Sequence, residues 1–511
     1  YHSNNKMNRS SKALKSVIFG FLFKILSMVG PFVVRIIVNW TLGVEYLGVS
    51  GVFSSVLSML SLAELGFASA ITYKCYSLYA ENDKVKLHAY LNFYKNVYRI
   101  IGMIIIVLGV AVTPFLKEVV SGEIPQELNI YVVYYILLFN TAISYFLAAY
   151  RTIILIVTQR QDIESKIAII CNLLMYILQI VILLFIKNYY IYLAMLPLCT
   201  IMINIVRYGI TKKKYPDLIP KGNITLEEKR EIVDGIKPLI GHRLQGTIVV
   251  SADNIVISIF MGITMVAIYN NYYTIIAALS GFIIAIYAAI QPGIGNSMVT
   301  ETVKKNYEDF NKLSFVLIWI IGWMSISSVC LFQDFISFTY GEKYLLPCTT
   351  VFLLVFEFYI WKTFDIVMTY RDVVGKWSGD GMIPYISGGF NLITNVVLVK
   401  LLGVNGVIIS TILAFTLFTI PNSLKVLLKD VFNVSIYDYL GKYVRDTLII
   451  FLVGILTYFI CKNINTNSSI INFICKGVIC IVIPNILLFM IWRKRKEYIF
   501  FKDKLIGKFI N

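Results

Sequence analysis

The stretch Ile470–Trp492 reads IINFICKGVICIVIPNILLFMIW and carries one charged side chain, Lys476. A run of about 20 apolar residues is long enough to cross a bilayer as an α-helix. The 511 residues are 58% hydrophobic, and thirteen further stretches resemble this one. These are Ser16–Thr41, Tyr46–Tyr73, Ala89–Thr113, Asn129–Val157, Ile163–Ile186, Tyr189–Ile210, Ile236–Met261, Val266–Ile290, Leu313–Phe338, Leu345–Tyr370, Ile383–Leu402, Val404–Leu428 and Tyr443–Ile460. We therefore predict an all-α integral membrane protein with fourteen transmembrane helices.

Residues 211–234 form the longest polar connection and separate six predicted helices from eight. Within it, Thr225 followed three residues later by Glu228 is the signature of a helix capping box. The sequence predicts two six-helix lobes, a linker and two additional helices. The expected boundaries are 1–6 for a remnant of cloning before Met7, 7–210 for the N-lobe, 211–235 for a cytoplasmic linker with a short amphipathic helix, 236–430 for the C-lobe, 431–492 for the last two helices and 493–511 for a basic cytoplasmic tail.

A short sequence similarity relates the two predicted lobes. Leu42-Gly43-Val44 lies between the first two predicted helices, and Met261-Gly262-Ile263 lies between the seventh and eighth. A tight turn centred on glycine joins two long helices at both places, which favours a parallel pseudo-repeat about an axis along the membrane normal. Any short hairpin also favours glycine, so both interpretations stay open.

Lysine and arginine are unevenly distributed between the predicted loops. The net charge is +17, with 46 Lys and Arg residues. If the N-terminus is cytoplasmic, only five of them fall in outer loops, namely Lys117, Lys187, Lys343, Lys400 and Lys462. The positive-inside rule then places both termini in the cytoplasm, with the basic tail on anionic lipid. Membrane topology accounts for the charge, and we expect no nucleic-acid partner.

Basic side chains interrupt the first and seventh predicted helices. Lys24 and Arg35 are eleven residues apart and therefore share one helix face. The seventh helix carries His242, Arg243 and, eleven residues after His242, Asp253. Ionisable residues at membrane depth usually face a polar pathway, and Arg and Lys are the residues that hold phosphate or pyrophosphate. These groups, together with Lys362 of the tenth helix, predict a cavity with a cationic lining.

Carboxylates at membrane depth indicate coupling to a cation. Glu64 lies in the second helix, and Glu357 and Asp365 follow one stripe of the tenth. A low-dielectric setting favours the protonated carboxylic acid, so Asp253, Glu64 and this stripe are candidates for exchanging H⁺ or for binding Na⁺. The alternative is that the charges only lock helices together, with Glu64 paired to Lys24 and Lys362 paired to Asp365 or Glu357.

The cysteines and histidines do not form a recognisable metal motif. Eight cysteines are scattered without a CxxC pair, and three histidines lack HExxH spacing. We interpret the cysteines as small apolar fillers of the helix interfaces. Apart from the Na⁺ alternative at the carboxylates, the sequence predicts no metal and no cofactor.

Four motifs give the chain its resemblance to a known family. They are RIIVNWTLGVEYLGV at 35–49, ELGFASAI at 64–71, AYR at 149–151 followed by QRQ at 159–161, and YGEKY at 340–344. With the two-lobe layout, they resemble the Wzx-type polysaccharide flippases, the polysaccharide transport family of the MATE-like exporter superfamily.

This resemblance implies an alternating-access carrier in the bacterial cytoplasmic membrane. Its substrate would be an undecaprenyl-diphosphate-linked oligosaccharide for O-antigen or capsule assembly, and its partners would be membrane lipids and the polysaccharide polymerase and chain-length machinery. Lys24, Arg35 and Arg243 would act as head-group ligands, and no enzymatic step is needed.

Three other classes of membrane protein are alternatives to this one. A lipid II flippase shares the fourteen helices and the basic cavity. A MATE-type exporter of cationic drugs shares the fold, but its cavity should be acidic. A membrane polymerase or ligase would need a large outer loop, whereas the longest outer connection here is Pro114–Leu128.

Overall fold

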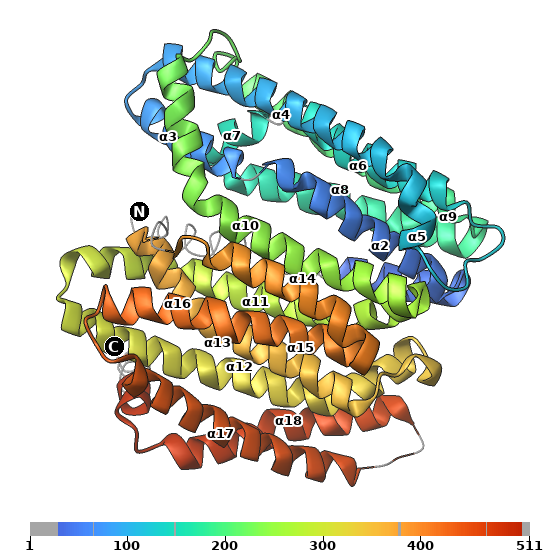
Figure 1. Cartoon of the computed structure of the whole chain (residues 1–511), viewed down its shortest axis with the longest axis vertical. Helices are drawn as coiled ribbons and strands as arrows, with labels where there is room; N and C mark the ends of the chain where they lie inside the picture. Colours follow the sequence, from blue (N-terminus) through green and yellow to red (C-terminus); the bar gives the residue numbers. More distant parts are fainter. Residues whose placement is uncertain are drawn as a thin grey trace, which may run out of the picture. The chain divides into compact units, whose positions relative to one another are not determined.

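The computed structural model describes residues 29–502 except 65, 148–149, 377–379, 465 and 467. Within this part the chain forms helices joined by turns and no strand, which confirms the predicted all-α class (Figure 1). The first described helix is Val29–Thr41. The others are α2 (Val44–Leu60), α3 (Phe67–Ala80), α4 (Lys84–Val112), α5 (Leu116–Val119), α6 (Ile130–Phe146), α7 (Tyr150–Val157), α8 (Gln161–Val181), α9 (Tyr189–Lys214), α10 (Leu226–Met261), α11 (Ile263–Thr300), α12 (Val303–Thr339), α13 (Cys348–Val374), α14 (Ile383–Leu402), α15 (Val404–Ala414), α16 (Ile420–Leu424), α17 (Ile436–Lys462) and α18 (Ser469–Trp492).

Ten helices of the described part are long and apolar enough to cross a membrane, or eleven if the bent pair α6 and α7 is one span. The predicted span Ser16–Thr41 lies partly outside the described residues. Tyr46–Tyr73 is interrupted by a 3₁₀ turn at Ser61–Glu64, after which Gly66 is left-handed. The tenth predicted span, α13, is long enough but carries three ionisable side chains within nine residues. The count of fourteen therefore stays a prediction.

Two compact units divide the chain, Tyr1–Ala267 and Ile268–Asn511, and each is described by itself. In the first unit, α2 packs against α6 and α10, α4 packs against α3 and α6, and α9 packs against α6 and α8. This division falls later than the linker 211–235 that the sequence predicts between the lobes, because α10 makes its contacts with α2 and α3 in the first unit.

The capping box predicted at Thr225 begins α10. The Thr225 hydroxyl accepts from the Glu228 backbone N–H at 3.2 Å, and a Glu228 carboxylate oxygen accepts from the Thr225 backbone N–H at 2.7 Å. The helix then continues without interruption for 36 residues. The segment predicted as a short amphipathic helix is thus the first part of α10. Since α9 extends to Lys214, only residues 215–225 connect α9 to α10.

Single glycines make the tight turns predicted between long helices. Gly43 follows Val29–Thr41 with a φ of 119°, and Gly262 joins α10 to α11 with a φ of 88°. Residues with a Cβ rarely adopt such positive φ values, so glycine is required at both turns. Beside the second turn, a Cβ on Gly48 would lie 2.1 Å from the carbonyl oxygen of Ile263. Gly48 therefore lets α2 approach the start of α11.

In the second unit, α12 packs against α13, α17 and α18, and α14 forms a hairpin with α15 (Figure 1). The hairpin turns at Gly403, whose φ is 59°. Its interior is polar: the Asn391 side-chain amide donates to the Thr411 hydroxyl at 3.1 Å, and the Ser410 hydroxyl donates to the Asn391 carbonyl at 2.9 Å. Such hydrogen bonds hold helices together where lipid offers no hydrophobic driving force.

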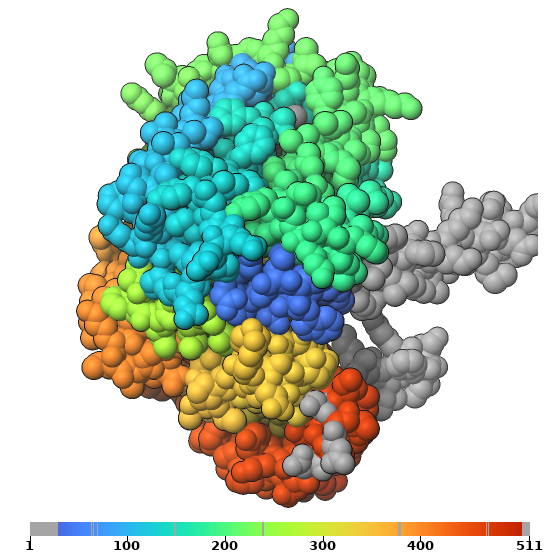
Figure 2. All heavy atoms as spheres, turned by 90° about the vertical axis from the view of Figure 1, so that its right-hand side faces the viewer, coloured from blue at the N-terminus to red at the C-terminus, as the bar shows by residue number. Residues whose placement is uncertain are grey.

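The antiparallel pair α12 and α18 is held by polar contacts along its length. Trp319 donates its indole N–H to the side chain of Asn485 at 2.9 Å, and Trp323 donates to the carbonyl of Cys480 at 2.8 Å. Figure 2 shows the red atoms of α17 and α18 lying against the yellow atoms near the end of α12. The two C-terminal helices are therefore packed onto α12.

Candidate functional site

A carboxylate and two tyrosines form a cluster in the first unit. Glu64, at the end of the 3₁₀ turn, accepts a short hydrogen bond from the Tyr98 hydroxyl and a second from the Tyr145 hydroxyl at 3.3 Å. The ring of Tyr98 also stacks on that of Tyr94, with centroids 4.1 Å apart. Buried hydroxyls need partners, so these tyrosines fix the position of the carboxylate. The sequence pointed to Glu64 but not to its tyrosine partners on α4 and α6.

Arg243 of α10 lies beside this cluster. A Cβ built on Gly66, two residues after Glu64, would lie 3.4 Å from Nε of Arg243. Gly66 has a φ of 97°, which a residue with a side chain rarely adopts. Glycine at 66 thus permits the break between the 3₁₀ turn and α3, and the Arg243 side chain lies within ordinary van der Waals range of that break. The structure therefore brings two predicted site residues, Glu64 and Arg243, to one junction.

Arg35 occupies a separate place in the first unit. Its Nη2 donates to the carbonyl of Ala267 at 3.2 Å. The side chain is half-buried. Lys24, which the sequence places on the same helix face, lies outside the described residues, as does its predicted pairing with Glu64.

The remaining predicted residues of the first unit lie at different depths of α10. Asp253 is buried, with 4% of its surface exposed, and its neighbour Asn254 donates to the Ser55 hydroxyl of α2 at 2.9 Å. His242 is half-buried. The eleven residues between His242 and Asp253 correspond to about 16 Å along the helix. The two share a face, as predicted, but they do not form one binding point.

On α13 of the second unit, the structure pairs two of the predicted residues with each other. Lys362 Nζ lies 2.8 Å from Asp365 Oδ2, with side chains 12% and 17% exposed. This is the helix-locking alternative raised for the pair. Glu357, the first member of the predicted stripe, is buried two turns before Asp365 on the same helix.

A cavity of about 1080 Å³ lies in the second unit between α12, α13, α17 and the start of α18. Its lining is mostly apolar and rich in aromatic rings, including Phe352, Phe356, Phe451, Tyr458 and Phe459. Asp334, Lys462 and Lys476 also line it. The cavity suits a ligand with a long apolar part, and its basic residues can meet an anionic group.

The ion pair of this cavity was missed by sequence reasoning. Lys476 Nζ lies 2.6 Å from Asp334 Oδ2, and both side chains are largely buried, with 15% and 16% exposed. Lys476 was noted as a charge within the last helix, but Asp334 was not singled out. Asp334 lies four residues from the predicted outer end of its span, and Lys476 lies six residues from the predicted outer end of its own. This similar depth in the membrane is the signal that could have paired them.

Comparison with solved structures identifies the fold. The chain is similar to "Lipid II flippase MurJ, inward closed conformation", with a TM-score of 0.72 and 13% identity over 93% of this chain and 99% of that one. It is also similar to an inward-facing multidrug resistance MATE family transporter of the MOP superfamily, with a TM-score of 0.58 and 15% identity over 78% and 93% of the two chains. The fold is that of the membrane transporters of this superfamily.

Sequence comparison gives the family. The uncharacterised membrane protein MJ1068 of Methanocaldococcus jannaschii is 23% identical over 435 residues, which cover 80% of this chain and 83% of that protein. Residues 13–298 match the family described as "Polysaccharide biosynthesis protein", and the chain belongs to that family. The resemblance drawn from the four motifs is thereby confirmed for family and fold.

Proposed function

We propose that this multi-pass membrane protein is a flippase for lipid-linked oligosaccharides. It moves undecaprenyl-diphosphate-linked repeat units from the inner to the outer leaflet, in the bacterial cytoplasmic membrane and with both termini cytoplasmic. The observation that carries the proposal is the pair of guanidinium groups, Arg35 and Arg243, on predicted spans of a polysaccharide-biosynthesis chain with a transporter fold. The planar fork of arginine matches the oxygens of a diphosphate, whereas it would repel a cationic drug.

The substrate has two parts, and the chain offers a different environment for each. Arg243 with His242, and Arg35 with Lys24, are two separate points at which the diphosphate head group binds along its path. The apolar cavity of the second unit takes part of the polyprenyl tail, which stays in a lipid-like setting. Lys362 is left out of the head-group set because Asp365 already neutralises it at 2.8 Å. Alternating access then moves the head group without a covalent step, so the protein needs no catalytic residue.

Coupling to H⁺ or Na⁺ is assigned to the carboxylates at membrane depth. Asp253 and Glu357 are buried, and Glu64 is held by two tyrosine hydroxyls. Charging a buried carboxylate is costly, so uptake of a cation there changes the relative stability of conformations. Transport in proteoliposomes should therefore depend on a pH gradient or a sodium gradient, and these two gradients can be imposed separately.

The test is the pool of lipid-linked oligosaccharide in cells that lack this gene, measured by mass spectrometry. Wild type should clear the accumulated undecaprenyl-diphosphate species, whereas Arg35→Ala and Arg243→Ala should not, at equal protein levels. Arg230→Ala is the matched control because Arg230 is an exposed arginine at the start of α10, outside the predicted spans. An unchanged pool, with altered sensitivity to cationic drugs, would move the chain to the drug exporters.

Lipid II transport is the second candidate, and the likeness to the lipid II flippase MurJ favours it. The same mass measurement separates the two. Accumulation of undecaprenyl-diphosphate carrying the peptidoglycan disaccharide would assign the chain to cell-wall synthesis, whereas a different oligosaccharide would assign it to a surface polymer.

A further inference from the structure

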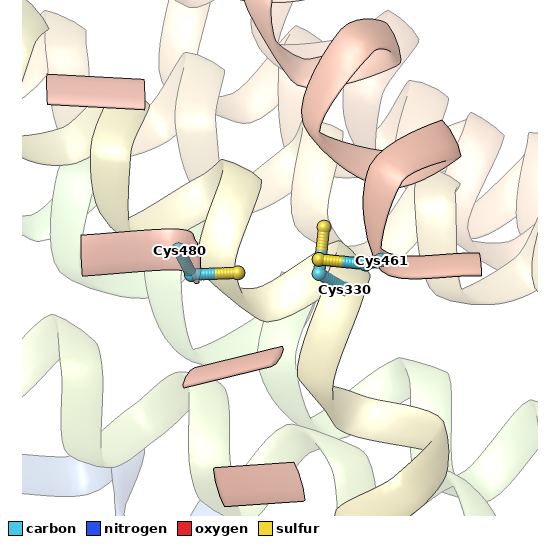
Figure 3. Close-up of side chains that lie close together, drawn as sticks. All are labelled: Cys330, Cys461 and Cys480. Carbon is cyan, nitrogen blue, oxygen red and sulfur yellow. The ribbon is translucent and has the colours of Figure 1, made fainter. Parts of the chain in front are cut away.

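Three cysteines from three helices meet in the second unit. Cys330 of α12, Cys461 of α17 and Cys480 of α18 place their sulfur atoms within 4.8 Å of one another (Figure 3). All three are buried, with 6%, 2% and 1% of their surfaces exposed. Their positions in the sequence gave no hint of this cluster, because no two of them are close enough to form a metal-binding motif.

The surrounding contacts hold this cluster in register. Asp334 lies one helical turn after Cys330 on α12, and Lys476 lies one turn before Cys480 on α18. The 2.6 Å ion pair between Asp334 and Lys476 therefore fixes the two cysteines opposite each other. On the other side, the Trp323 indole bonds the carbonyl of Cys480 itself. Sites carried by packed helices in this way are geometrically well defined.

The cluster also borders the apolar cavity of the second unit. Cys330 and Cys461 belong to the lining of the 1080 Å³ cavity, together with Asp334 and Lys476. Cys480 is not part of that lining, so it lies behind the other two thiols. A cation that enters the cavity would thus come close to two residues of the cluster.

We propose that Cys330, Cys461 and Cys480 form a binding site for a thiophilic d¹⁰ metal ion, with Cu⁺ preferred over Zn²⁺. Sulfur ligands select these soft ions. Three sulfurs around an ion at about 2.3 Å lie roughly 4 Å apart, so the sulfur atoms need to close by less than about 1 Å. Each cysteine that binds as a thiolate releases one proton to water. This site borders the cavity that we assign to the polyprenyl tail, but metal binding does not require the proposed lipid transport and is measured without it.

Charge and coordination number favour the monovalent ion. A single thiolate neutralises Cu⁺, whereas Zn²⁺ needs two, and an uncompensated charge in this apolar setting is costly. Structural zinc sites also take four ligands, and the group of described residues offers three.

The experiment measures copper bound to the full-length protein in detergent, kept reduced and free of oxygen. Cu⁺ is supplied from the chelator bicinchoninate, and copper and protein are quantified after desalting. We expect one Cu⁺ per wild-type chain. Cys480→Ala and Cys330→Ser should each weaken binding at least about tenfold. Zn²⁺ supplied in parallel should bind more weakly than Cu⁺ in wild type.

Cys75→Ser is the matched control, because Cys75 is equally buried but lies outside the cluster. It should retain one Cu⁺ per chain. If Cys480→Ala does not give a monodisperse protein, Cys461→Ala and alkylation of wild type in the presence and absence of Cu⁺ test the same site. Equal copper binding by Cys480→Ala and wild type would overturn the proposal, as would reduced wild-type protein that retains no copper.

Discussion

Replacing Asp380 with asparagine is expected to destabilise the second unit because it removes a carboxylate that is paired with a buried arginine. Arg371 Nη2 lies 2.6 Å from Asp380 Oδ1, and the two side chains are 0% and 3% exposed. The same oxygen accepts from the Asn422 side-chain amide at 2.6 Å, and Arg371 Nη1 donates to the Ser423 hydroxyl at 2.9 Å. The network ties the end of α13 to α16.

The magnitude follows from burial. Removing one partner of a buried ion pair costs about 3–5 kcal/mol. Asparagine can still accept a hydrogen bond, so Asp380→Asn belongs at the lower end, about 3 kcal/mol. In a unit of this size each kcal/mol corresponds to roughly 2–4 °C, which gives a Tm lowered by roughly 6–12 °C. The measurement is the fraction of monodisperse protein that survives heating in detergent, followed by size-exclusion chromatography.

An exposed ion pair of the same length provides the control. Lys237 Nζ lies 2.6 Å from Asp234 Oδ1, but both side chains are 65% exposed. Asp234→Asn should therefore cost less than about 1 kcal/mol. The double variant Arg371→Met/Asp380→Asn should be more stable than the sum of the single effects predicts. Equal losses of Tm in Asp380→Asn and Asp234→Asn would contradict this prediction. Additive losses in Arg371→Met and Asp380→Asn would contradict it as well.

Three further predictions concern the first unit. Gly48→Ala should cost about 1–3 kcal/mol, because its Cβ would lie 2.1 Å from the carbonyl oxygen of the first residue of α11, whereas Gly246→Ala meets nothing within 4 Å and should keep the wild-type Tm. Tyr98→Phe removes a hydroxyl donor to Glu64 and should lower the free energy of unfolding by about 1–3 kcal/mol, and unchanged stability would argue against the bond. Thr225→Ala removes the N-cap of α10, costs about 1 kcal/mol and should speed hydrogen exchange in its first turn, so an unchanged exchange rate would contradict the capping box.

The helices were predictable from apolar runs, but their interruptions and extensions were not. Tyr46–Tyr73 looks continuous in hydropathy, yet the chain breaks before α3. The break depends on Glu64 being held by tyrosines more than thirty residues away, and on the left-handed Gly66. Other helices are longer than predicted. Thr225 indicates where a helix begins, but the sequence does not distinguish a short surface helix from the first turns of the long helix α10.

The charged residues of the site were visible in the sequence, whereas most of their partners were not. Lys362 and Asp365 are three apart on one helix, so their pairing follows from local geometry. Asp334 and Lys476 are separated by 142 residues and meet only through the register of α12 against α18. The three cysteines, which the sequence alone predicts to be apolar fillers, converge for the same tertiary reason.

The hairpin of α14 and α15 has a consequence for how the protein is made. One glycine, Gly403, separates the two helices. The connection is therefore too short for α14 to insert into the bilayer while α15 remains in water. Asn391 and Asn395 of α14 are fully buried, and their amides would face acyl chains if α15 were missing. The insertion machinery at the ribosome must therefore admit both helices together, and a chain that stopped at Leu402 would present bare amides to lipid and to the quality-control proteases of the membrane.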